Sequence, residues 1–233
     1  MLTVMREIVL DTETTGLNAL AGDRVIEIGC VELRNHIATG RTFHSYINPQ
    51  RSVPAEAVSI HGLDDEFLSD KPAFEAIVDE FTEFVGDSPL VAHNASFDRG
   101  FINMELHRSQ RPEFAEERFV DTLVLARRRH PAGPNSLDAL CARYKIDSSA
   151  RTKHGALLDA EILAEVYVEL LGGRQADLGL SQAGDQVLAA TSQITVARRP
   201  EPLPPRLTPA DVDAHRSFIR TLGKKALWLK YLS

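Results

Sequence analysis

The sequence predicts an α/β protein with an extended C-terminal tail. Apolar residues follow a strand pattern in the first fifty positions and recur with the period of a helix from position 72 onward. Short strand-like runs interrupt the helical part, and the composition changes after Gly172-Gly173. We therefore expect a domain over residues 1–173, a flexible linker over 174–209 and a separate C-terminal segment over 210–233.

Three strands are expected before residue 50. Residues 7–12 contain a run of aliphatic residues that ends at Thr14-Thr15-Gly16, and residues 24–33 alternate apolar with polar side chains. Residues 41–47 are good strand formers and stop at Asn48-Pro49. Because the connections between these runs are short, we expect antiparallel pairing.

Helices and short strands alternate in the rest of this domain. Residues 72–85 place apolar side chains on one helical face, and residues 90–92 form a short buried strand. Asn94 is expected to cap the next helix, because its side chain can accept a hydrogen bond from a first-turn amide. The elements expected after it are a strand at 119–120 and helices from 122, over 135–144 and over 155–171.

Composition is typical of a globular protein without membrane spans. Apolar residues make up 43% of the chain and charged residues 25%. No apolar run is long enough to cross a bilayer, and the first ten residues lack the pattern of a signal peptide. Cys30 and Cys141 lie among apolar residues without the spacing of a zinc or redox site. We expect buried free thiols in a cytoplasmic protein.

The charge is distributed unevenly along the chain. The formal net charge is −7, yet residues 196–233 hold eight Lys and Arg against three Asp and Glu. This leaves −12 on the remainder, which argues against gripping nucleic acid by charge alone. Either metal ions offset the acids where substrate binds, or a partner supplies the affinity, or both.

Three groups of residues carry candidate chemistry. Asp11 and Glu13 point to the same face of a strand at the end of its apolar run. Asp98 lies four residues after Asn94 on one face of a starting helix, where the dipole also favours an acid. His154 precedes a helix whose first turns carry Asp159. Each group alone also fits a surface or capping role, but together they place four acids and a histidine at element ends.

These groups match the three motifs of the DEDDh exonucleases. The matching segments are residues 11–16, 93–98 and 154–159, and their order and separation also fit. The chain resembles this family over residues 6–173, which implies an RNase H-like fold with a mixed central sheet flanked by helices. Segments 135–141 and 151–157 and the layout of the tail most resemble the proofreading epsilon subunits of bacterial DNA polymerase III.

The resemblance implies hydrolysis of DNA 3′ ends with two divalent ions, Mg²⁺ or Mn²⁺. Phosphodiester hydrolysis builds negative charge on the attacking and leaving oxygens, and hard cations that offset this charge prefer carboxylate ligands. By resemblance, Asp11, Glu13 and Asp159 bind metal directly and Asp98 completes the set. His154 is the expected general base, because the intrinsic pKa of imidazole is near neutrality.

Substrate contacts are also implied by the resemblance. The ligands Asp11, Glu13 and Asp159 face the substrate, Glu56 approaches the 3′-hydroxyl, and His61 approaches the neighbouring base or phosphate. The sequence alone fits equally well an exposed loop acid at position 56 and a turn histidine at position 61. Additional candidates are the backbone amides of Thr14, Thr15 and Gly16 and the side chains of His93 and Phe97, of which Phe97 also fits the core.

The tail is expected to bind partners through two pieces. Residues 175–180 resemble the clamp-binding motif of bacterial replication proteins, but they equally fit a loose continuation of the domain. Residues 211–233 resemble the segment that docks on the catalytic (alpha) subunit of the polymerase. Binding of a small theta-like subunit is left open. The expected anchors are Gln175, Leu178 and Leu180 in the first piece and Phe218, Leu222 and Trp228 in the second.

Two other functions fit part of the sequence. An RNA-trimming exonuclease would use the same motifs, because they handle the phosphate and not the 2′-hydroxyl. The tail argues against it, since a trimming enzyme needs no tether to a polymerase. A catalytically idle adaptor between polymerase and clamp would explain the tail, but five intact catalytic residues argue against it. The expected substrate is therefore a single-stranded or mismatched DNA 3′ end.

Overall fold

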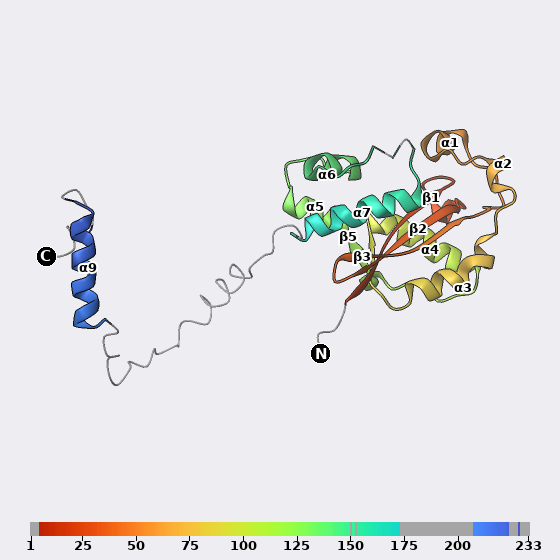
Figure 1. Ribbon diagram of the computed structural model, residues 1–233. Helices are drawn as coiled ribbons and strands as arrows, with labels where there is room; N and C mark the ends of the chain where they lie inside the picture. Colours follow the sequence, from red (N-terminus) through yellow and green to blue (C-terminus); the bar gives the residue numbers. More distant parts are fainter. Residues whose placement is uncertain (1–4, 150, 152, 173–206, 224–227, 229–233) are drawn as a thin grey trace. The chain divides into compact units, whose positions relative to one another are not determined.

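Figure 1 shows a computed structural model of the chain, in which residues 5–149, 151, 153–172, 207–223 and 228 are described. The chain divides into two units, residues 1–178 and 179–233, and each is described by itself. The first unit holds the sheet with its helices, and the second holds α9 (Pro209–Thr221). Most of the expected linker lies outside the described residues, as do Gln175, Leu178 and Leu180.

A mixed five-stranded sheet forms the centre of the first unit, in the order β3-β2-β1-β4-β5. β1 (Arg6–Thr14) pairs antiparallel with β2 (Val25–Arg34), which pairs antiparallel with β3 (Ile37–Tyr46). On its other edge β1 pairs parallel with β4 (Leu90–Ala92), and β4 pairs parallel with β5 (Phe119–Asp121). The predicted antiparallel pairing and the mixed sheet are confirmed.

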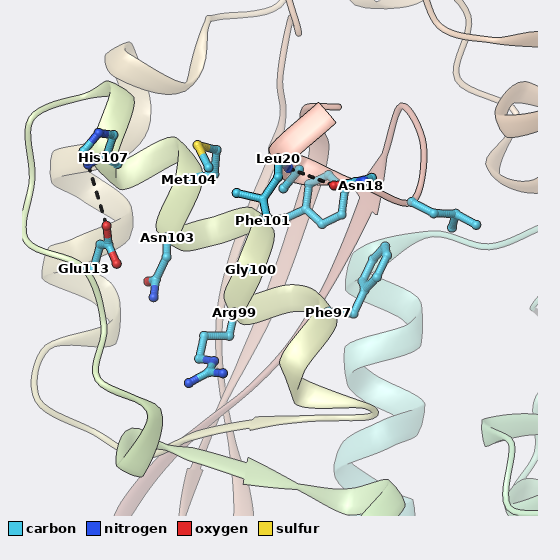
Figure 2. Close-up of a pocket in the computed structure, with 12 residues that line it drawn as sticks. Asn18, Leu20, Phe97, Arg99, Gly100, Phe101, Asn103, Met104, His107 and Glu113 are labelled. Atoms are coloured by element: carbon cyan, nitrogen blue, oxygen red, sulfur yellow. Dashed lines mark hydrogen bonds and ion pairs between the residues drawn. The ribbon is translucent and has the colours of Figure 1, made fainter. Parts of the chain in front are cut away.

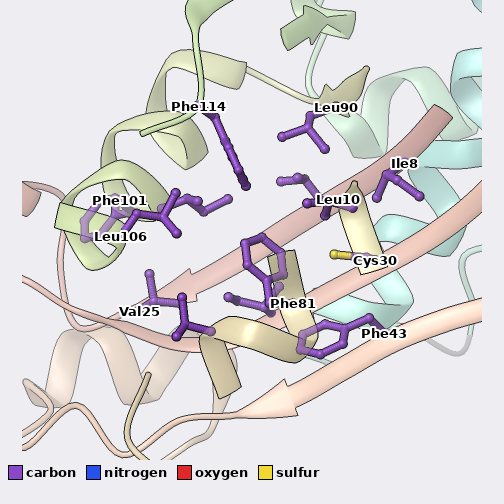
Figure 3. Close-up of a cluster of buried hydrophobic side chains, with 14 of the residues drawn as sticks. Ile8, Leu10, Val25, Cys30, Phe43, Phe81, Leu90, Phe101, Leu106 and Phe114 are labelled. Carbon is purple, nitrogen blue, oxygen red and sulfur yellow. The ribbon is translucent and has the colours of Figure 1, made fainter. Parts of the chain in front are cut away.

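Helices cover both faces of this sheet (Figure 1). Successive side chains of a strand point to opposite faces, so Ile8 and Leu10 meet the cluster that contains Phe81 and Phe101, drawn in Figure 3. Val9 faces the other way and packs in the cluster of the last long helix. Burial on both faces explains the unbroken aliphatic run in β1. The long helices are α3 (Phe74–Val85) and α4 (Ala95–Arg108) on the first face and α7 (Ala156–Leu170) on the second, with α5 (Thr122–Arg129) and α6 (Leu137–Tyr144) packed against α7.

Several elements differ from the sequence-based expectation. β3 begins at Ile37 and not at residue 41, because Asn35 and His36 both adopt positive φ and form a tight hairpin turn. α1 (Ala55–His61) and α2 (Asp65–Leu68) were not predicted, since seven and four residues are too few to show a helical period. Glu56 and His61, for which the sequence fitted a loop acid and a turn histidine equally well as substrate contacts, thus lie on α1. Two 3₁₀ turns complete the unit, Ala19–Ala21 and Glu116–Arg118.

α9 opens with a capping box between Thr208 and Asp211 and with Pro209 at its first position. Ile219 is buried, whereas Phe218 and Leu222 are mostly exposed. Among the described helices of the chain, none is both long and apolar enough to cross a bilayer. Cys30 and Cys141 are buried free thiols, as predicted.

Candidate active site

The three predicted motifs converge on one cavity of about 290 Å³. The strand end of β1 contributes two acids, α4 and α7 each contribute one from their first turns, and the histidine stands on the loop before α7. All five predicted side chains line this cavity: Asp11, Glu13, Asp98, His154 and Asp159.

Alternation along β1 sorts its side chains between the two faces. Asp11 and Glu13 share a face with Val9, which packs in the cluster that contains α7 residues. Thr12 points to the α4 side, where its hydroxyl donates a 2.8 Å hydrogen bond to Asp98 Oδ1. Thr12 thus orients the carboxylate of Asp98, a role that no sequence pattern predicts.

A glycine lets α7 approach the sheet at this point. Gly29 of β2 is paired with Asp11 in the strand register. A Cβ at Gly29 would lie 2.2 Å from the backbone nitrogen of Leu157, so only glycine permits this contact. The close approach brings Asp159, in the first turn of α7, to the end of β1. No sequence pattern predicts this role, because it depends on a contact between distant segments.

Asn94 does not cap α4 in the predicted manner. Its backbone is left-handed (φ 66°), and its side chain makes no capping hydrogen bond with α4, all of whose residues are described. An N-cap side chain normally reaches the first-turn amides from an extended backbone, which is absent here. The backbone N–H of Asn94 instead donates to Asp121 Oδ1 at 3.2 Å, and this hydrogen bond ties the start of α4 to the end of β5.

Burial raises the pKa values of three acids of the cavity, and neighbouring charges raise them further. Burial, followed by the charges of Asp98, Glu13 and Asp159, raises the pKa of Asp11 well above its usual value. Burial is also the main cause that raises the pKa of Glu13 to about 8 and that of Asp98 to about 7. These shifts mean that the folded protein holds clustered carboxylates at a cost unless a positive charge offsets them.

The donor set fits hard divalent cations. Ligand atoms of Glu13, His154 and Asp159 lie within 4.8 Å of one another, and Asp11 and Asp98 line the same cavity. Buried carboxylates with raised pKa values are the groups that a cation would stabilise in their charged form. His154 keeps 48% of its side chain exposed, and its Nδ1 lies 3.4 Å from Asp159 Oδ2, so it can reach a water molecule in the cavity.

One cation of the site comes from the chain itself. Arg151 lines the cavity and pairs with Asp159, with its Nε 2.5 Å from Oδ1. Burial alone would lower the pKa of the Arg151 guanidinium, but hydrogen bonds and charge from Asp159 and Asp138 raise it overall. No sequence pattern around Arg151 predicts a role for it, because its distance along the chain from Asp138 and Asp159 does not show that it pairs with them.

The structure places some of the predicted substrate contacts at the cavity and others outside its lining. His93 and Phe97 line the cavity, and the Phe97 ring also packs 4.8 Å from that of Phe101, so both predicted roles are compatible with its position. The backbone N–H of Thr15 is not available to substrate as predicted, because it already donates to Arg24 O at 2.9 Å. The side-chain hydroxyl of Thr14 donates to Gly16 O.

Glu56 and His61 lie outside the residues that line the cavity, on α1. Glu56 is exposed, whereas His61 is buried and its Nδ1 accepts a hydrogen bond from Leu63 N–H at 3.0 Å. Within the described residues His61 Nε2 has no hydrogen-bond partner. α1 nevertheless contacts the catalytic loop, because the His154 amide donates to Ile60 O at 3.4 Å. A role for both residues toward substrate remains a prediction.

The pKa shifts predict how stability depends on pH without divalent ions. A carboxyl whose pKa is raised in the folded state contributes stability that is fully present below its unfolded pKa, near 4, and is lost as pH rises through the folded pKa. We expect Asp98→Asn to raise the melting temperature in EDTA relative to wild type by several degrees at pH 8, because it removes roughly 1–3 kcal/mol of cost for a charged carboxylate in a buried site, and by little at pH 5.

Comparing variant with wild type at each pH is necessary because burial lowers the pKa of His61 and of His93, which gives a slope of opposite sign. The surface variant Asp79→Asn, whose acid pairs with Arg111 and does not line the cavity, is the matched control. Equal melting temperatures of Asp98→Asn and wild type at pH 8 would contradict the proposed cost of the buried charge.

Comparison with known proteins agrees with this fold. The sequence profile of the exonuclease family matches residues 8–167, and the chain belongs to that family. DNA polymerase III subunit epsilon of Rickettsia felis is 46% identical over 95% of this chain and 99% of its own length, and that of Escherichia coli is 43% identical over 97% and 98%. These relatives are epsilon subunits, and the chain belongs to that branch.

Solved structures show the same architecture. Exonuclease X in complex with 5′-overhanging duplex DNA is 28% identical with a TM-score of 0.57, over 71% of this chain and 90% of that chain. The nuclease domain of 3′hExo, a DEDDh family member bound to rAMP, has a TM-score of 0.63 over 73% and 94%, with 16% identity. The second likeness supports the fold alone, and the predicted RNase H-like exonuclease fold is confirmed.

Proposed function

We propose that this chain is the 3′→5′ exonuclease that proofreads for the replicative DNA polymerase III of a bacterium, where it works in the cytoplasm. It removes mispaired 3′-terminal nucleotides and releases deoxynucleoside monophosphates. The observation that carries this proposal is the convergence of Asp11, Glu13, Asp98, Asp159 and His154 on one cavity. The identity of 41–47% to epsilon subunits over most of the chain supports DNA as the substrate.

The residues of the cavity divide the chemistry between them. Two divalent ions, Mg²⁺ or Mn²⁺, held by the four carboxylates would offset the charge that develops on the attacking and leaving oxygens. Thr12 orients Asp98, and the packing of α7 on Gly29 orients Asp159. His154 accepts the proton of the attacking water on its imidazole ring, since it combines an exposed edge with proximity to Asp159.

A second cavity, of about 580 Å³, follows α4 and shares Phe97 with the catalytic one (Figure 2). Leu17 and Leu20 at its rim are 85% and 87% exposed. Apolar and aromatic side chains next to a catalytic cavity suit the faces of unpaired bases. We propose that the nucleotides preceding the terminal one lie here, which requires the strand to leave its duplex.

The proposed function predicts a preference for unpaired ends. A mismatch lowers the energy needed to splay the terminal nucleotide away from its template. We expect a DNA primer with a mismatched 3′ end to be shortened faster than the same primer with a matched end, and an unpaired strand to be cut fastest. The measurement compares initial rates on three labelled substrates at equal concentration. Equal rates on matched and mismatched ends would refute the proofreading role.

We also propose that the tail delivers the enzyme to its partners, the polymerase catalytic (alpha) subunit and the sliding clamp. On α9 and beyond, Phe218, Leu222 and Trp228 are 60%, 50% and 55% exposed, which suits apolar anchors of an interface. A partner that binds the tail would supply the affinity for DNA that the negatively charged nuclease unit lacks. A theta-like third subunit stays an open possibility, and residues 175–180 stay the candidate for clamp binding.

Deleting residues 206–233 tests this division of roles. We expect the shortened chain to hydrolyse free single-stranded oligonucleotides at the rate of the full chain and to lose co-purification with the polymerase catalytic subunit. The double variant Phe218→Ala/Leu222→Ala in the full chain should weaken the same association. Unchanged affinity of the shortened chain for the polymerase would show that the tail is not the docking segment.

A further inference from the structure

The guanidinium of Arg151 contacts both an expected metal ligand and the expected general base. Its Nη2 donates to Asp159 Oδ2 at 2.8 Å and lies 2.8 Å from His154 Nδ1. Its Nη1 pairs with Asp138 of α6. Only 9% of the Arg151 side chain is exposed, although it lies in a loop. One side chain thus links the catalytic loop, α6 and α7.

The contact with Asp159 uses both carboxylate oxygens. Nε lies 2.5 Å from Oδ1, but this contact is an ion pair without hydrogen-bond alignment, and Oδ1 has no hydrogen-bond partner among the described residues. Asp159 is buried, so the guanidinium is a close positive charge for this carboxylate. A divalent cation that takes Asp159 as a ligand must share or displace that contact.

The contact with His154 provides the loop with an anchor. The other described attachments of His154 are its long amide hydrogen bond to Ile60 O, 3.4 Å, and the 3.4 Å approach of Nδ1 to Asp159. Because a guanidinium only donates, His154 Nδ1 accepts this contact, and the imidazole can take up a proton there only after the guanidinium turns away from it. The pairing of Arg151 with Asp138 ties the loop to α6 in either case. A planar fork holds its donors in a fixed geometry, whereas the donors of an ammonium rotate freely.

We propose that Arg151 is a positioning residue that ties the loop of His154 to α6 through Asp138 and at the same time competes with divalent cations for Asp159. This inference rests on the proposed function for its catalytic half, whereas the competition for Asp159 concerns cation binding alone. The two roles have opposite consequences when the guanidinium is removed. Cation affinity should rise because a positive charge leaves the acidic cavity, and turnover should fall because the loop that carries the imidazole is no longer tied to α6.

The experiment measures both quantities on the same full-length variants. Isothermal titration calorimetry with Mn²⁺ gives the cation affinity, and hydrolysis of a single-stranded oligonucleotide at saturating Mn²⁺ gives turnover. For Arg151→Ala we expect Mn²⁺ to bind roughly tenfold tighter or more. We expect turnover to fall about ten- to a hundredfold, the usual cost of losing a partner that orients a catalytic side chain.

A second variant separates charge from geometry. Arg151→Lys keeps the positive charge but loses the fork, so we expect nearly wild-type Mn²⁺ affinity together with reduced turnover. Arg111→Ala, which removes an arginine from a surface ion pair with Asp79, is the matched control and should change neither quantity. Melting temperatures in EDTA confirm that each variant is folded.

Weaker Mn²⁺ binding by Arg151→Ala would overturn the competition, because it would mean that the guanidinium assembles the ligands. Unchanged or faster turnover of Arg151→Ala would overturn the positioning role. If the wild-type chain binds Mn²⁺ but hydrolyses no oligonucleotide, the proposed function fails, and the calorimetric comparison of the variants still decides the competition for Asp159.

Discussion

Asp11→Asn should lower the rate of hydrolysis by three or more powers of ten while leaving the fold intact. Asp11 is half-buried and lines the cavity together with Asp98, Glu13 and Asp159, whose charges add to burial in raising its pKa. Losing a ligand costs several kcal/mol of transition-state stabilisation, and each 1.4 kcal/mol is about tenfold in rate. The amide preserves shape, so packing should not change.

The same substitution should not destabilise the metal-free protein. It removes a carboxyl whose pKa is raised by burial and by neighbouring acids, so the melting temperature in EDTA at pH 8 should stay equal or rise. The surface substitution Asp79→Asn is the matched control for the change from acid to amide. Near-wild-type hydrolysis by Asp11→Asn would rule out this carboxylate as a ligand.

His154→Ala should lower turnover by roughly two to four powers of ten, the usual contribution of a positioned general base. The imidazole is half-exposed, and its backbone contacts come from the amide, so its removal should leave both packing and oligonucleotide affinity nearly unchanged. Turnover at saturating Mn²⁺ and equilibrium binding with Ca²⁺ in place of Mn²⁺ separate the two effects.

The control for this variant is His36→Ala, whose imidazole pairs with Glu7 outside the catalytic cavity. It should keep wild-type turnover. A His154→Ala variant that loses Mn²⁺ affinity, rather than turnover at saturating Mn²⁺, would identify the residue as a ligand and not as the base.

The longest elements of the fold are the ones that the sequence predicted most directly. β1 carries an unbroken aliphatic run because both of its faces are buried, and α3, α4 and α7 show a helical period over twelve or more residues. α1 and α2 are too short to show a helical period. The turn at Asn35 and His36 requires two positive φ values, which the sequence Asn-His does not predict. The errors therefore fall on short elements and on turns.

The candidate site was predicted because each motif combines unusual residue types with a fixed spacing. Asp11 with Glu13 on β1, and His154 with Asp159 across the start of α7, keep their relation within one short segment, so the sequence is enough to find them. Arg151 and Gly29 act only through contacts between segments distant in the chain. No local pattern can show that a glycine of β2 admits α7, or which acids a loop arginine meets.

The choice between DNA and RNA and the metal dependence of hydrolysis give the most direct test of the account. Wild-type protein is incubated with a 5′-labelled DNA oligonucleotide and, separately, with RNA of the same sequence, each with Mn²⁺ or with EDTA. The account predicts that DNA is shortened one nucleotide at a time from its 3′ end, only with Mn²⁺, and faster than RNA. Preferred degradation of RNA, internal cleavage, or hydrolysis that persists in EDTA would contradict a metal-dependent 3′→5′ DNA exonuclease.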